Sequence, residues 1–511
     1  MEPIPVRNIM ISVTLNLANF EYDIHSLVKA FFPKEDVAVS TETRAAEEEP
    51  LFSMDIIYDI GGGEPDAIHI LIDKKEMAQI VVDYADRTET KNRLKQALYR
   101  VLSEYTNRKL PWGTLTGIRP TKIAMGFLEE GRSEVWIRDY MRDTYLASPE
   151  KIDLSIEIAG RELSLLKKLD YEEGYSLYIG IPFCPSTCLY CSFTSYPLSM
   201  WAGRVDEYLD ALEKEMDFTA AACKNKKLNT IYIGGGTPTT LSADQLDRLL
   251  TKIEQTFDFQ HLLEYTVEAG RPDSITREKL MVLRKHPISR ISINPQTMKQ
   301  ETLDLIGRRH TVQETVESFE LARSLGFDNI NMDLIVGLPE ETIDDVRDTM
   351  ERLRILNPDS ITVHSLAIKR AARLKMFQEE YQELHITNTW ETIELTARYA
   401  REMGLLPYYL YRQKNMAGNF ENVGYAREGK AGLYNILIME EKQSILALGA
   451  GATTKYVYPD GRIERTENVK DIANYLERVD EMVERKRQGL EKWLGCNSLA
   501  RTEGSFANGV G

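Results

Sequence analysis

The stretch YIGIPFCPSTCLYCSFTSYP, residues 178–197, holds three of the five cysteines of the chain within eight positions. Cys184, Cys188 and Cys191 follow a short run rich in Ile and Tyr, which is typical of a buried β-strand, and they lead into a turn. Three thiols clustered at the end of a strand are candidate metal ligands. The pattern therefore raises the question of why a fourth ligand is missing.

The first alternative is a structural zinc ion, which takes four ligands that usually come as two pairs of Cys or His. No His lies between Tyr175 and Cys223, Cys223 falls within a predicted helix, and Cys496 lies near the C-terminal tail. Buried, unreactive cysteines are usually scattered along a chain instead of clustering on a turn. The spacing Cys-x3-Cys-x2-Cys therefore favours a [4Fe–4S] cluster, which normally takes four thiolates and here receives three.

Three thiolates leave one iron with an open coordination position, and this opening answers the question of the missing ligand. S-adenosylmethionine (SAM) uses such a position by chelating the iron through its amino and carboxylate groups. An electron from the cluster then cleaves the sulfonium to methionine and a 5′-deoxyadenosyl radical, so that the cofactors carry the difficult chemistry. Tyr190, the aromatic residue just before the last cysteine, is expected to pack against the cofactor.

Length and composition exclude several classes of protein. A chain of 511 residues predicts two or three domains. The formal net charge of −16 disfavours nonspecific binding to nucleic acid or to an anionic membrane, although it permits a local basic pocket. No signal peptide and no membrane span is readable, and five cysteines are too few for a disulfide framework. We therefore expect a cytoplasmic protein.

Residues 1–165 predict a separate N-terminal α/β domain, to which the sequence assigns no role. Strands are expected over residues 8–16, 51–60, 66–73 and 78–84 because β-branched residues recur there between turn residues. A helix over 88–106 follows, with Thr88 or Thr90 as its N-cap. The run Gly61-Gly62-Gly63 is expected to be a loop, since no helix start follows it.

From residue 170 to 375 short strands alternate with amphipathic helices. The expected strands cover residues 175–181, 229–235, 264–269, 290–294, 329–337 and 360–366. This alternation predicts parallel βαβ units and an α/β fold, a partial (β/α)6 barrel, with its chemistry at the carboxyl ends of the strands. Residues 376–495 are expected to form an extension that completes the core and ends in a short helical C-terminal region. Residues 496–511 are expected to be a disordered tail.

At this point the order of motifs resembles a known family. The segments YIGIPFCPSTCLYCSF, IYIGGGTPTTL, VEAGRPD, RISINPQTM, LIGRRHT and NMDLIVGLPEET occur in this order over about 190 residues. Together they resemble the oxygen-independent coproporphyrinogen III oxidase-like radical SAM proteins. The N-terminal domain and the segment LPWGTLTGIRP are similar to the coproporphyrinogen dehydrogenase branch of that family.

The resemblance implies a role for residues outside the cysteine motif. Tyr178 would contact the SAM molecule on the cluster, and Glu268 would accept hydrogen bonds from its ribose hydroxyls. Gly235, Gly236 and Thr237 would let the backbone approach the methionine moiety, with Pro238 fixing the turn. The alternative for the glycine run is an ordinary tight turn before a helix capped by Ser242.

A second SAM site is also implied by the resemblance, since members of the family line such a site with residues that correspond to Gln296, Arg308, Asp333 and Ala367. In that case two SAM molecules bind instead of one. The alternative interpretation is that Arg308 and Asp333 form a structural ion pair.

The substrate implied by the family is coproporphyrinogen III, a tetrapyrrole with four propionates. A radical would remove a hydrogen from the β-carbon of a propionate, after which CO2 and an electron leave and a vinyl group remains. Recognition of carboxylates needs local cations. The candidates are Lys369, Arg370, Arg373, Lys375, Arg412 and Lys414, with a basic face of a solvated helix as the alternative. The reaction also needs an electron donor, which the sequence does not identify.

Two departures from the family pattern bear on the reaction. The oxidases carry a further cysteine two positions after the last cluster ligand, whereas this chain has Phe193, as do the related heme chaperones. The chaperones in turn carry a His-Asn-x-x-Tyr-Trp element where this chain has Tyr434 to Met439, without the histidine that could ligate heme. The hypotheses are therefore an oxidative decarboxylase, a heme-binding protein, and a radical enzyme acting on another substrate.

Overall fold

The computed structural model describes residues 10–33, 35–42, 50–62, 65–117, 119–167, 169–193, 195–367, 384–413 and 420–507, and from residue 496 onward it describes the backbone alone. The chain divides into two compact units, one of residues 1–160 with 412–419 and one of residues 161–411 with 420–511. No helix within the described ranges is long and apolar enough to cross a membrane.

The first unit begins with a five-stranded sheet and two helices that pack on it, before further helices follow. The elements of the sheet and its two helices are β1 (Met10–Leu15), α1 (Glu21–Phe31), β2 (Asp36–Ser40), β3 (Phe52–Asp59), β4 (Ala67–Ile72), β5 (Lys75–Val81) and α2 (Arg87–Thr106). The sheet order is β2-β1-β3-β4-β5, with β1 parallel to both of its neighbours and the rest antiparallel. The four strands expected from the sequence are confirmed, and β2 was not predicted.

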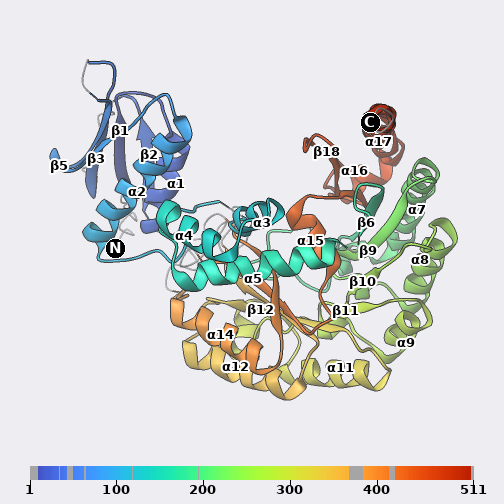
Figure 1. Cartoon of the computed structure of the whole chain (residues 1–511). Helices are drawn as coiled ribbons and strands as arrows, with labels where there is room; N and C mark the ends of the chain where they lie inside the picture. The colour runs from blue at the N-terminus through green and yellow to red at the C-terminus, as the bar shows by residue number, and fades with distance from the viewer. Residues whose placement is uncertain are drawn as a thin grey trace. The chain divides into compact units, whose positions relative to one another are not determined.

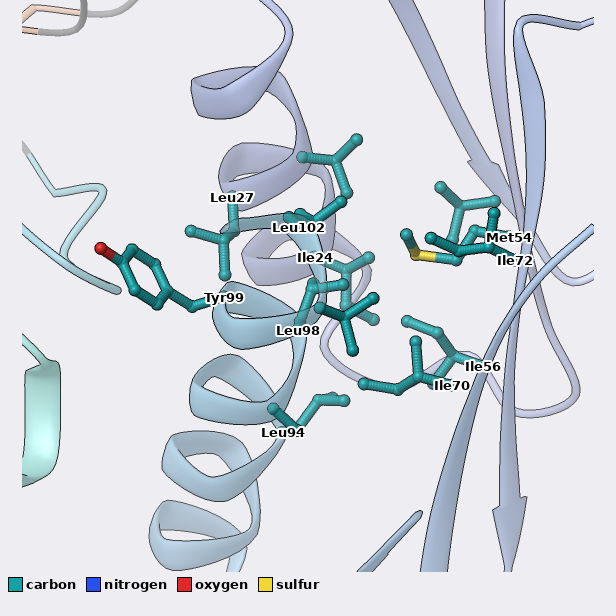
Figure 2. Packing of buried hydrophobic residues seen from close by; sticks show 14 of the residues in the cluster. Ile24, Leu27, Met54, Ile56, Ile70, Ile72, Leu94, Leu98, Tyr99 and Leu102 are labelled. Atoms are coloured by element: carbon teal, nitrogen blue, oxygen red, sulfur yellow. The ribbon is translucent and has the colours of Figure 1, made fainter. Parts of the chain in front are cut away.

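The core of this unit lies between the sheet and the two helices. Leu94, Leu98 and Leu102 recur on one side of α2, and Figure 2 shows these side chains and that of Ile24 of α1 between the helices and the strands; Leu27 of α1 belongs to the same cluster. All five side chains are fully buried. Apolar residues at intervals of three and four along α2 therefore explain why this stretch forms a helix on the sheet.

The predicted N-cap of α2 was wrong. Asp86, not Thr88 or Thr90, accepts hydrogen bonds from the backbone N–H groups of Thr88 and Glu89, at 3.0 and 2.9 Å. A carboxylate can accept from two of the unpaired N–H groups of a first helical turn and carries a favourable charge there. The Thr90 hydroxyl instead donates to the carbonyl of Asp83.

Helices α3 (Thr121–Glu129), α4 (Glu134–Tyr145) and α5 (Pro149–Leu166) follow, and six parallel strands then form the centre of the second unit. They are β6 (Gly174–Ile181), β9 (Lys227–Gly235), β10 (Glu264–Glu268), β11 (Arg290–Ser292), β12 (Ile330–Val336) and β13 (Ser360–Ser365), and all pair with their neighbours in chain order. All six predicted strands are confirmed, and with their helices they form the expected partial (β/α)6 barrel.

The connecting helices lie on the outer side of this curved sheet (Figure 1). They are α7 (Val205–Ala222), α8 (Ala243–Thr256), α9 (Arg277–Lys285), α11 (Val312–Ser324) and α12 (Ile343–Leu356). Ser242 caps α8 as expected, because its side chain and that of Gln245 each bond the backbone N–H of the other. The right-handed parallel crossovers bring the carboxyl ends of all six strands to one side of the sheet.

The C-terminal part extends this sheet at both edges. On the β13 side lie β15 (Asn422–Ala426) and β14 (Leu406–Tyr411), both antiparallel to their neighbours. On the other side β16 (Ser444–Leu448) runs parallel to β6, followed by β17 (Thr453–Val457) and β18 (Ile463–Glu467). This region thus contributes strands as well as the expected helices.

The helices of the C-terminal part are α14 (Trp390–Glu402), α15 (Leu433–Glu440), α16 (Ile472–Glu477) and α17 (Val479–Ala507). The last of them continues to Ala507, into the segment for which the sequence predicts disorder. The glycine-rich segment at residues 449–452 follows β16 directly and lies beside the carboxyl end of β6, since β16 and β6 pair in parallel.

A buried ion pair fastens this C-terminal part to the barrel. Lys486 of α17 lies 3.2 Å from the Glu215 carboxylate of α7, and both side chains are at most 1% exposed. Tyr475 and the backbone N–H of Gly449 also donate to that carboxylate, at 2.6 and 2.8 Å. Asn468 donates to both of its oxygens. A buried charge with this many partners is well compensated, so that the loss of one member leaves the others uncompensated.

Replacing Glu215 by alanine is therefore expected to destabilise the second unit by about 3–5 kcal/mol, because Lys486 would stay buried without its carboxylate. Urea-induced unfolding followed by circular dichroism measures this change. Asp217→Ala on the same helix is the matched control, because Asp217 forms an exposed ion pair with Lys252 and should lose less than about 1 kcal/mol. Equal losses in the two variants would contradict the role given to the buried pair.

Candidate functional site

The three clustered cysteines lie on one loop that follows β6, here called the cysteine loop (residues 183–193). The loop begins with β7 (Phe183–Cys184), which pairs with β8 (Tyr196–Pro197) just after it. Cys188 is buried, Cys184 and Cys191 are half-buried, and all three are free thiols. The loop thus presents three thiols at the carboxyl end of the first barrel strand, where the sequence predicts them.

Backbone hydrogen bonds from two other motifs hold the cysteine loop in place. The N–H of Thr237, after β9, donates to the carbonyl of Phe183 at 2.7 Å. The N–H of Leu189 donates to the carbonyl of Ile306 at 2.9 Å, and the Ser186 hydroxyl donates to the carbonyl of Gly307. The segments GGGTPT and LIGRRHT therefore support the cysteines directly, although they lie far apart in the sequence.

The thiols lie in surroundings that disfavour their charged form in the absence of a cation. Burial, together with the neighbouring thiols Cys188 and Cys184, raises the pKa of the Cys191 thiol to about 11, although a backbone hydrogen bond at Phe193 and the Arg308 charge oppose this. Burial also raises the pKa of Cys184, against a hydrogen bond from Thr237. A bound metal cation reverses this preference for the neutral thiol, because a thiol that coordinates a metal loses its proton outright. The donor set therefore fits a thiolate-bound metal cluster.

The geometry also bears on the zinc alternative. Among the described residues no group of three or more His, Cys, Asp or Glu side chains is arranged around a single metal ion. A structural zinc ion would need four such ligands at one point. In a [4Fe–4S] cluster each thiolate binds a different iron, so its cysteines do not converge on one point. The preference for the cluster over zinc therefore rests on the Cys-x3-Cys-x2-Cys spacing.

The glycine run after β9 lies against the end of β6. Gly235 adopts a φ of +107°, a backbone conformation that favours glycine. The N–H of Gly236 donates to the carbonyl of Ile181 at 2.8 Å, and a Cβ atom on Gly236 would lie 2.5 Å from the carbonyl oxygen of Phe183. The run is therefore more than an ordinary turn, because a side chain at position 236 would displace the base of the cysteine loop.

Glu268, at the end of β10, lies against this glycine run, since a Cβ atom on Gly234 would lie 2.8 Å from its Oε2 atom. The Tyr232 hydroxyl donates to its Oε1 atom at 2.5 Å, and the backbone N–H of Gly235 donates to the same carboxylate. Burial raises the pKa of Glu268 to about 7, the bond from Tyr232 lowers it in part, and the nearby Asp333 charge raises it. Glu268 therefore changes charge near neutral pH, which is unusual for a glutamate.

Three tyrosines stack beside this carboxylate. The ring centroid of Tyr434 of α15 lies 4.5 Å from that of Tyr232 of β9, and the ring of Tyr178 of β6 lies 6.3 Å from both. All three ring planes are within 22° of parallel. Tyr434 is buried, and burial raises the pKa of its hydroxyl. The residue at the position of the chaperone histidine is thus packed within the barrel.

Four residues are assigned to a second SAM site, and two of them are linked through a third residue, Asn294. Arg308 donates to the backbone carbonyl of Asn294 at 2.6 Å, and the Asn294 side chain accepts from the backbone N–H of Asp333. Arg308 and Asp333 are therefore linked through Asn294, and the structural ion pair considered as an alternative is not formed. Gln296 follows β11, donates its backbone N–H to the carbonyl of Asp333 at 3.0 Å and has a positive φ of 66°. Ala367 follows β13 and is half-buried.

A described neighbour of the Asp333 carboxylate is His364. The carboxylate lies 3.9 Å from Nε2 of His364 on the next strand, and the Nδ1 atom of His364 lies 3.3 Å from the Tyr411 hydroxyl. Burial alone would raise the pKa of Asp333, but hydrogen bonds from His364 and Asn331 outweigh it and leave the pKa below its usual value. Asp333 is therefore an anion inside the barrel, whereas Glu268, with its pKa raised to about 7, is divided between the protonated and the charged form near neutral pH.

Tyr190 lies on the cysteine loop next to Arg308. Burial raises the pKa of the Tyr190 hydroxyl, and the Arg308 guanidinium opposes this by a hydrogen bond and by its charge. The ring also packs against a small apolar cluster that contains Leu189, Leu303 and Ile306. The predicted packing of Tyr190 against a cofactor stays a prediction, since the contacts described are with protein groups.

A cavity of about 200 Å³ opens at the carboxyl end of β6. Its lining includes Tyr178, Gly180, Gly235 and the exposed side chain of Phe193, together with residues 450–452 from the loop after β16. The C-terminal extension thus supplies one wall of the cavity. Small side chains on that wall leave room for a bound group beside the cysteine loop.

The cations expected to bind propionates are only partly described. Lys369, Arg370, Arg373, Lys375 and Lys414 lie outside the described residues. Arg412 is 4% exposed, and its guanidinium donates to the carbonyl of Leu115 at 2.7 Å and lies over the Trp112 ring. Its described contacts are therefore with the segment LPWGTL of the first unit, so a substrate role for Arg412 stays a prediction.

Several residues at the site were not predicted from the sequence. Tyr232 and His364 point into the barrel from the interior of their strands, at positions that alternate with core residues. Arg271 lies in the segment VEAGRPD and contacts the cysteine loop. A polar residue at an inward position of a barrel strand is the signal that could have identified the first two. Nothing in the sequence pairs Arg271 with a residue 85 positions earlier.

The chain is similar to a known family of proteins. Residues 178–353 match the family model of the Radical SAM superfamily. The chain is 42% identical over 409 residues to the oxygen-independent coproporphyrinogen-III oxidase-like protein HemZ of Bacillus subtilis, which covers 79% of this chain and 82% of that protein. It is 33% identical to the heme chaperone HemW of the same organism over 60% of this chain and 76% of that protein. Among solved structures, coproporphyrinogen III oxidase (HemN) from Escherichia coli, described as a radical SAM enzyme, gives a TM-score of 0.49 at 23% identity, over 63% of this chain and 73% of that one.

Alanine at Cys184, Cys188 or Cys191 is expected to abolish uptake of iron and inorganic sulfide after anaerobic reconstitution, because each thiolate would bind one iron of a four-iron cluster. Iron and sulfide analysis and the visible absorption band measure this loss. Cys223→Ala is the matched control, since Cys223 is also a buried thiol but lies at the end of α7. Cys496→Ala is a second control. Loss of iron in either control would show that the ligands are assigned wrongly.

Proposed function

This chain belongs to the family of oxygen-independent coproporphyrinogen III oxidase-like radical SAM proteins, and from that premise we propose that it is an enzyme that decarboxylates coproporphyrinogen III without oxygen. The observation that carries the proposal is the set of three free thiols on one loop at the carboxyl end of β6. Three thiolates occupy three irons of a cubane cluster and leave the fourth for a cofactor.

We assign cluster ligation to Cys184, Cys188 and Cys191. Members of the Radical SAM superfamily hold a [4Fe–4S] cluster and SAM, which together supply a carbon-centred radical when both are bound. The chain's own part is to hold the loop, to keep water away from the thiols and to orient the cofactor. The hydrogen bond from Thr237 to the carbonyl of Phe183 and that from Leu189 to the carbonyl of Ile306 perform the first of these tasks.

Glu268 is suited to bind the ribose of SAM. As a carboxylate it accepts two hydrogen bonds, which matches two adjacent hydroxyl groups. The Gly235 N–H and the Tyr232 hydroxyl fix its orientation, and Tyr178 lies on the neighbouring strand beside the cavity. The backbone of Gly235, Gly236 and Thr237 carries no large side chain towards the end of β6, which supports their assignment to the methionine moiety.

The proposed reaction converts a propionate side chain into a vinyl group. A hydrogen atom leaves the β-carbon to the radical, the bond between the α-carbon and the carboxylate breaks to release CO2, and one electron passes to an acceptor. One double bond forms between the α- and β-carbons, so atoms and electrons balance. The acceptor, and the donor that reduces the cluster, are separate redox partners of the protein.

We extend the proposal to a second SAM molecule near Gln296, Arg308, Asp333 and Ala367. Asp333 stays anionic in the barrel and could hold the amino group of a ligand, and Arg308 is linked to it through Asn294. The unusual backbone conformation of Gln296 supports a role for this segment, since such strain often occurs at functional sites.

A heme-binding protein is the second candidate function, and Phe193 favours it. This residue stands where the oxidases carry a cysteine and is 71% exposed at the cavity. The burial of Tyr434 between the barrel strands argues against it, because no histidine is available at that position and the side chain there is packed on Tyr232. We therefore rank the enzyme first.

Two assays on one anaerobically reconstituted sample separate the candidates. Chromatography of tetrapyrroles after incubation with SAM, a reductant and coproporphyrinogen III is expected to show the decarboxylated product together with 5′-deoxyadenosine. Heme titration is expected to produce no stoichiometric shift of the Soret band. SAM cleavage without tetrapyrrole conversion would contradict this substrate, and stoichiometric heme uptake without SAM cleavage would favour the chaperone.

The affinity for SAM is expected to depend on pH through Glu268. Its raised pKa of about 7 keeps the side chain protonated in mildly acidic solution, and the carboxylate that accepts two hydroxyl groups forms only as the pH rises. The ratio of wild-type affinity to Glu268→Gln affinity should therefore increase about tenfold between pH 6 and pH 8. Equilibrium dialysis with labelled SAM measures it, and the ratio cancels the titration of SAM itself.

Glu341→Gln is the matched control for this experiment. Burial also raises the pKa of Glu341 to about 7, but its carboxylate accepts from the Thr297 hydroxyl at 2.5 Å, away from the cavity-lining residues. This variant should follow the wild-type pH dependence. A wild-type to Glu268→Gln ratio that is constant with pH would exclude Glu268 from ribose binding as a titrating group.

A further inference from the structure

Arg271 reaches from the connection after β10 to the cysteine loop. It is 3% exposed, and its Nη1 atom donates to the carbonyl and to the hydroxyl of Ser186, at 3.1 and 3.0 Å. The same Nη1 atom lies 3.7 Å from the Cys188 sulfur, within hydrogen-bonding range for a thiolate. Of the three cysteines, Cys188 is the most deeply buried. A fully charged group thus lies directly against a proposed cluster ligand.

The carboxylate of Asp273 fixes the orientation of the Arg271 guanidinium. Its Nε atom donates to Oδ1 at 3.0 Å and its Nη2 atom donates to Oδ2 at 2.7 Å, which is a bidentate pair. A bidentate pair fixes the plane of the guanidinium, so Nη1 is directed at the cysteine loop. A lysine at this position would carry the same charge without this fixed orientation.

The other charged groups around Cys188 increase the local positive charge. Arg308 is buried on the same thiol and bonds the Tyr190 hydroxyl. His310 is fully buried behind the two arginines, and neither of its ring nitrogens has a hydrogen-bond partner. Burial lowers the pKa of His310, and the Arg308 charge lowers it further, so this ring adds no charge. The balance is two guanidinium groups against the single carboxylate of Asp273.

We propose that Arg271, clamped by Asp273, is a positioning residue that raises the reduction potential of the cluster bound by the cysteine loop. This inference rests on the cluster ligation proposed above. A cluster gains one negative charge when it is reduced, and a buried cation that donates a hydrogen bond to a ligand sulfur stabilises the reduced form more than the oxidised form. The charge of Asp273 acts in the opposite direction from a greater distance.

The test is the midpoint potential of the reconstituted protein, followed by electron paramagnetic resonance during an anaerobic redox titration. Arg271→Gln removes the charge and is expected to lower the potential. At the wild-type midpoint the ratio of oxidised to reduced cluster should increase at least tenfold, which equals 59 mV for one electron. Arg277→Gln is the matched control, since it removes an equal charge from an exposed position six residues away, and it should leave the potential unchanged.

Asp273→Asn keeps the test decisive if Arg271→Gln fails to take up iron. The asparagine can still accept from Nε of Arg271, but the opposing negative charge is gone, so the potential should rise. Shifts of opposite sign in the two variants support an electrostatic role. A residue that merely held the loop would give no shift, or a shift of the same sign in both, together with loss of iron.

The outcomes separate this inference from the proposed function. A wild-type protein that binds no four-iron cluster would overturn the cluster site and this inference with it. A wild-type cluster whose potential is the same in Arg271→Gln would overturn the inference alone. An unchanged or lowered potential in Asp273→Asn with a full iron content would do the same.

Discussion

The close approach of the backbone after β9 to the end of β6 is the constraint on which the whole site depends. Gly236 and Thr237 donate their N–H groups to the carbonyls of Ile181 and Phe183, and these bonds continue the parallel pairing of the two strands beyond their regular part. A side chain at Gly236 would collide with the Phe183 carbonyl. The cysteine loop can leave β6 in its observed direction only because this position has no Cβ atom.

The order of the strands in the sheet then determines where the other side chains of the site lie. β10 is the next neighbour, and it places Glu268 beside Tyr232 and the glycine run. The connection after β10 then carries Arg271 back to the cysteine loop, and the segment before α11 supports the loop from the other side. Each motif thus contributes one group to a site that no single motif could form, as parallel sheets with helical crossovers allow.

Much of this arrangement could be predicted from the sequence, because the relevant signals are local. Six short strands rich in β-branched residues, each followed by an amphipathic helix, fix the central fold, and three cysteines in eight positions fix the candidate cluster ligands. Signals that depend on distant partners were missed. This holds for Arg271, whose contacts lie 85 residues away. The strands β14 to β18 likewise pair with elements far away in the chain. The cap Asp86 is a local signal that was overlooked because threonines, which are also favoured N-caps, follow it, and β2 was missed because its strand is short and half-exposed.

The position of β16 limits how much of the sheet can form while the chain is being synthesised. The paired residues Tyr175 and Ser444 are separated by more than half of the chain. At about 5–20 residues per second, a ribosome needs roughly 15–50 s to make the intervening segment. During this interval one edge of β6 has no strand to pair with. The loop after β16, which forms one wall of the cavity beside the cysteine loop, has not yet been synthesised. The cluster proposed for the cysteine loop would therefore meet its complete surroundings only after β16 has been synthesised.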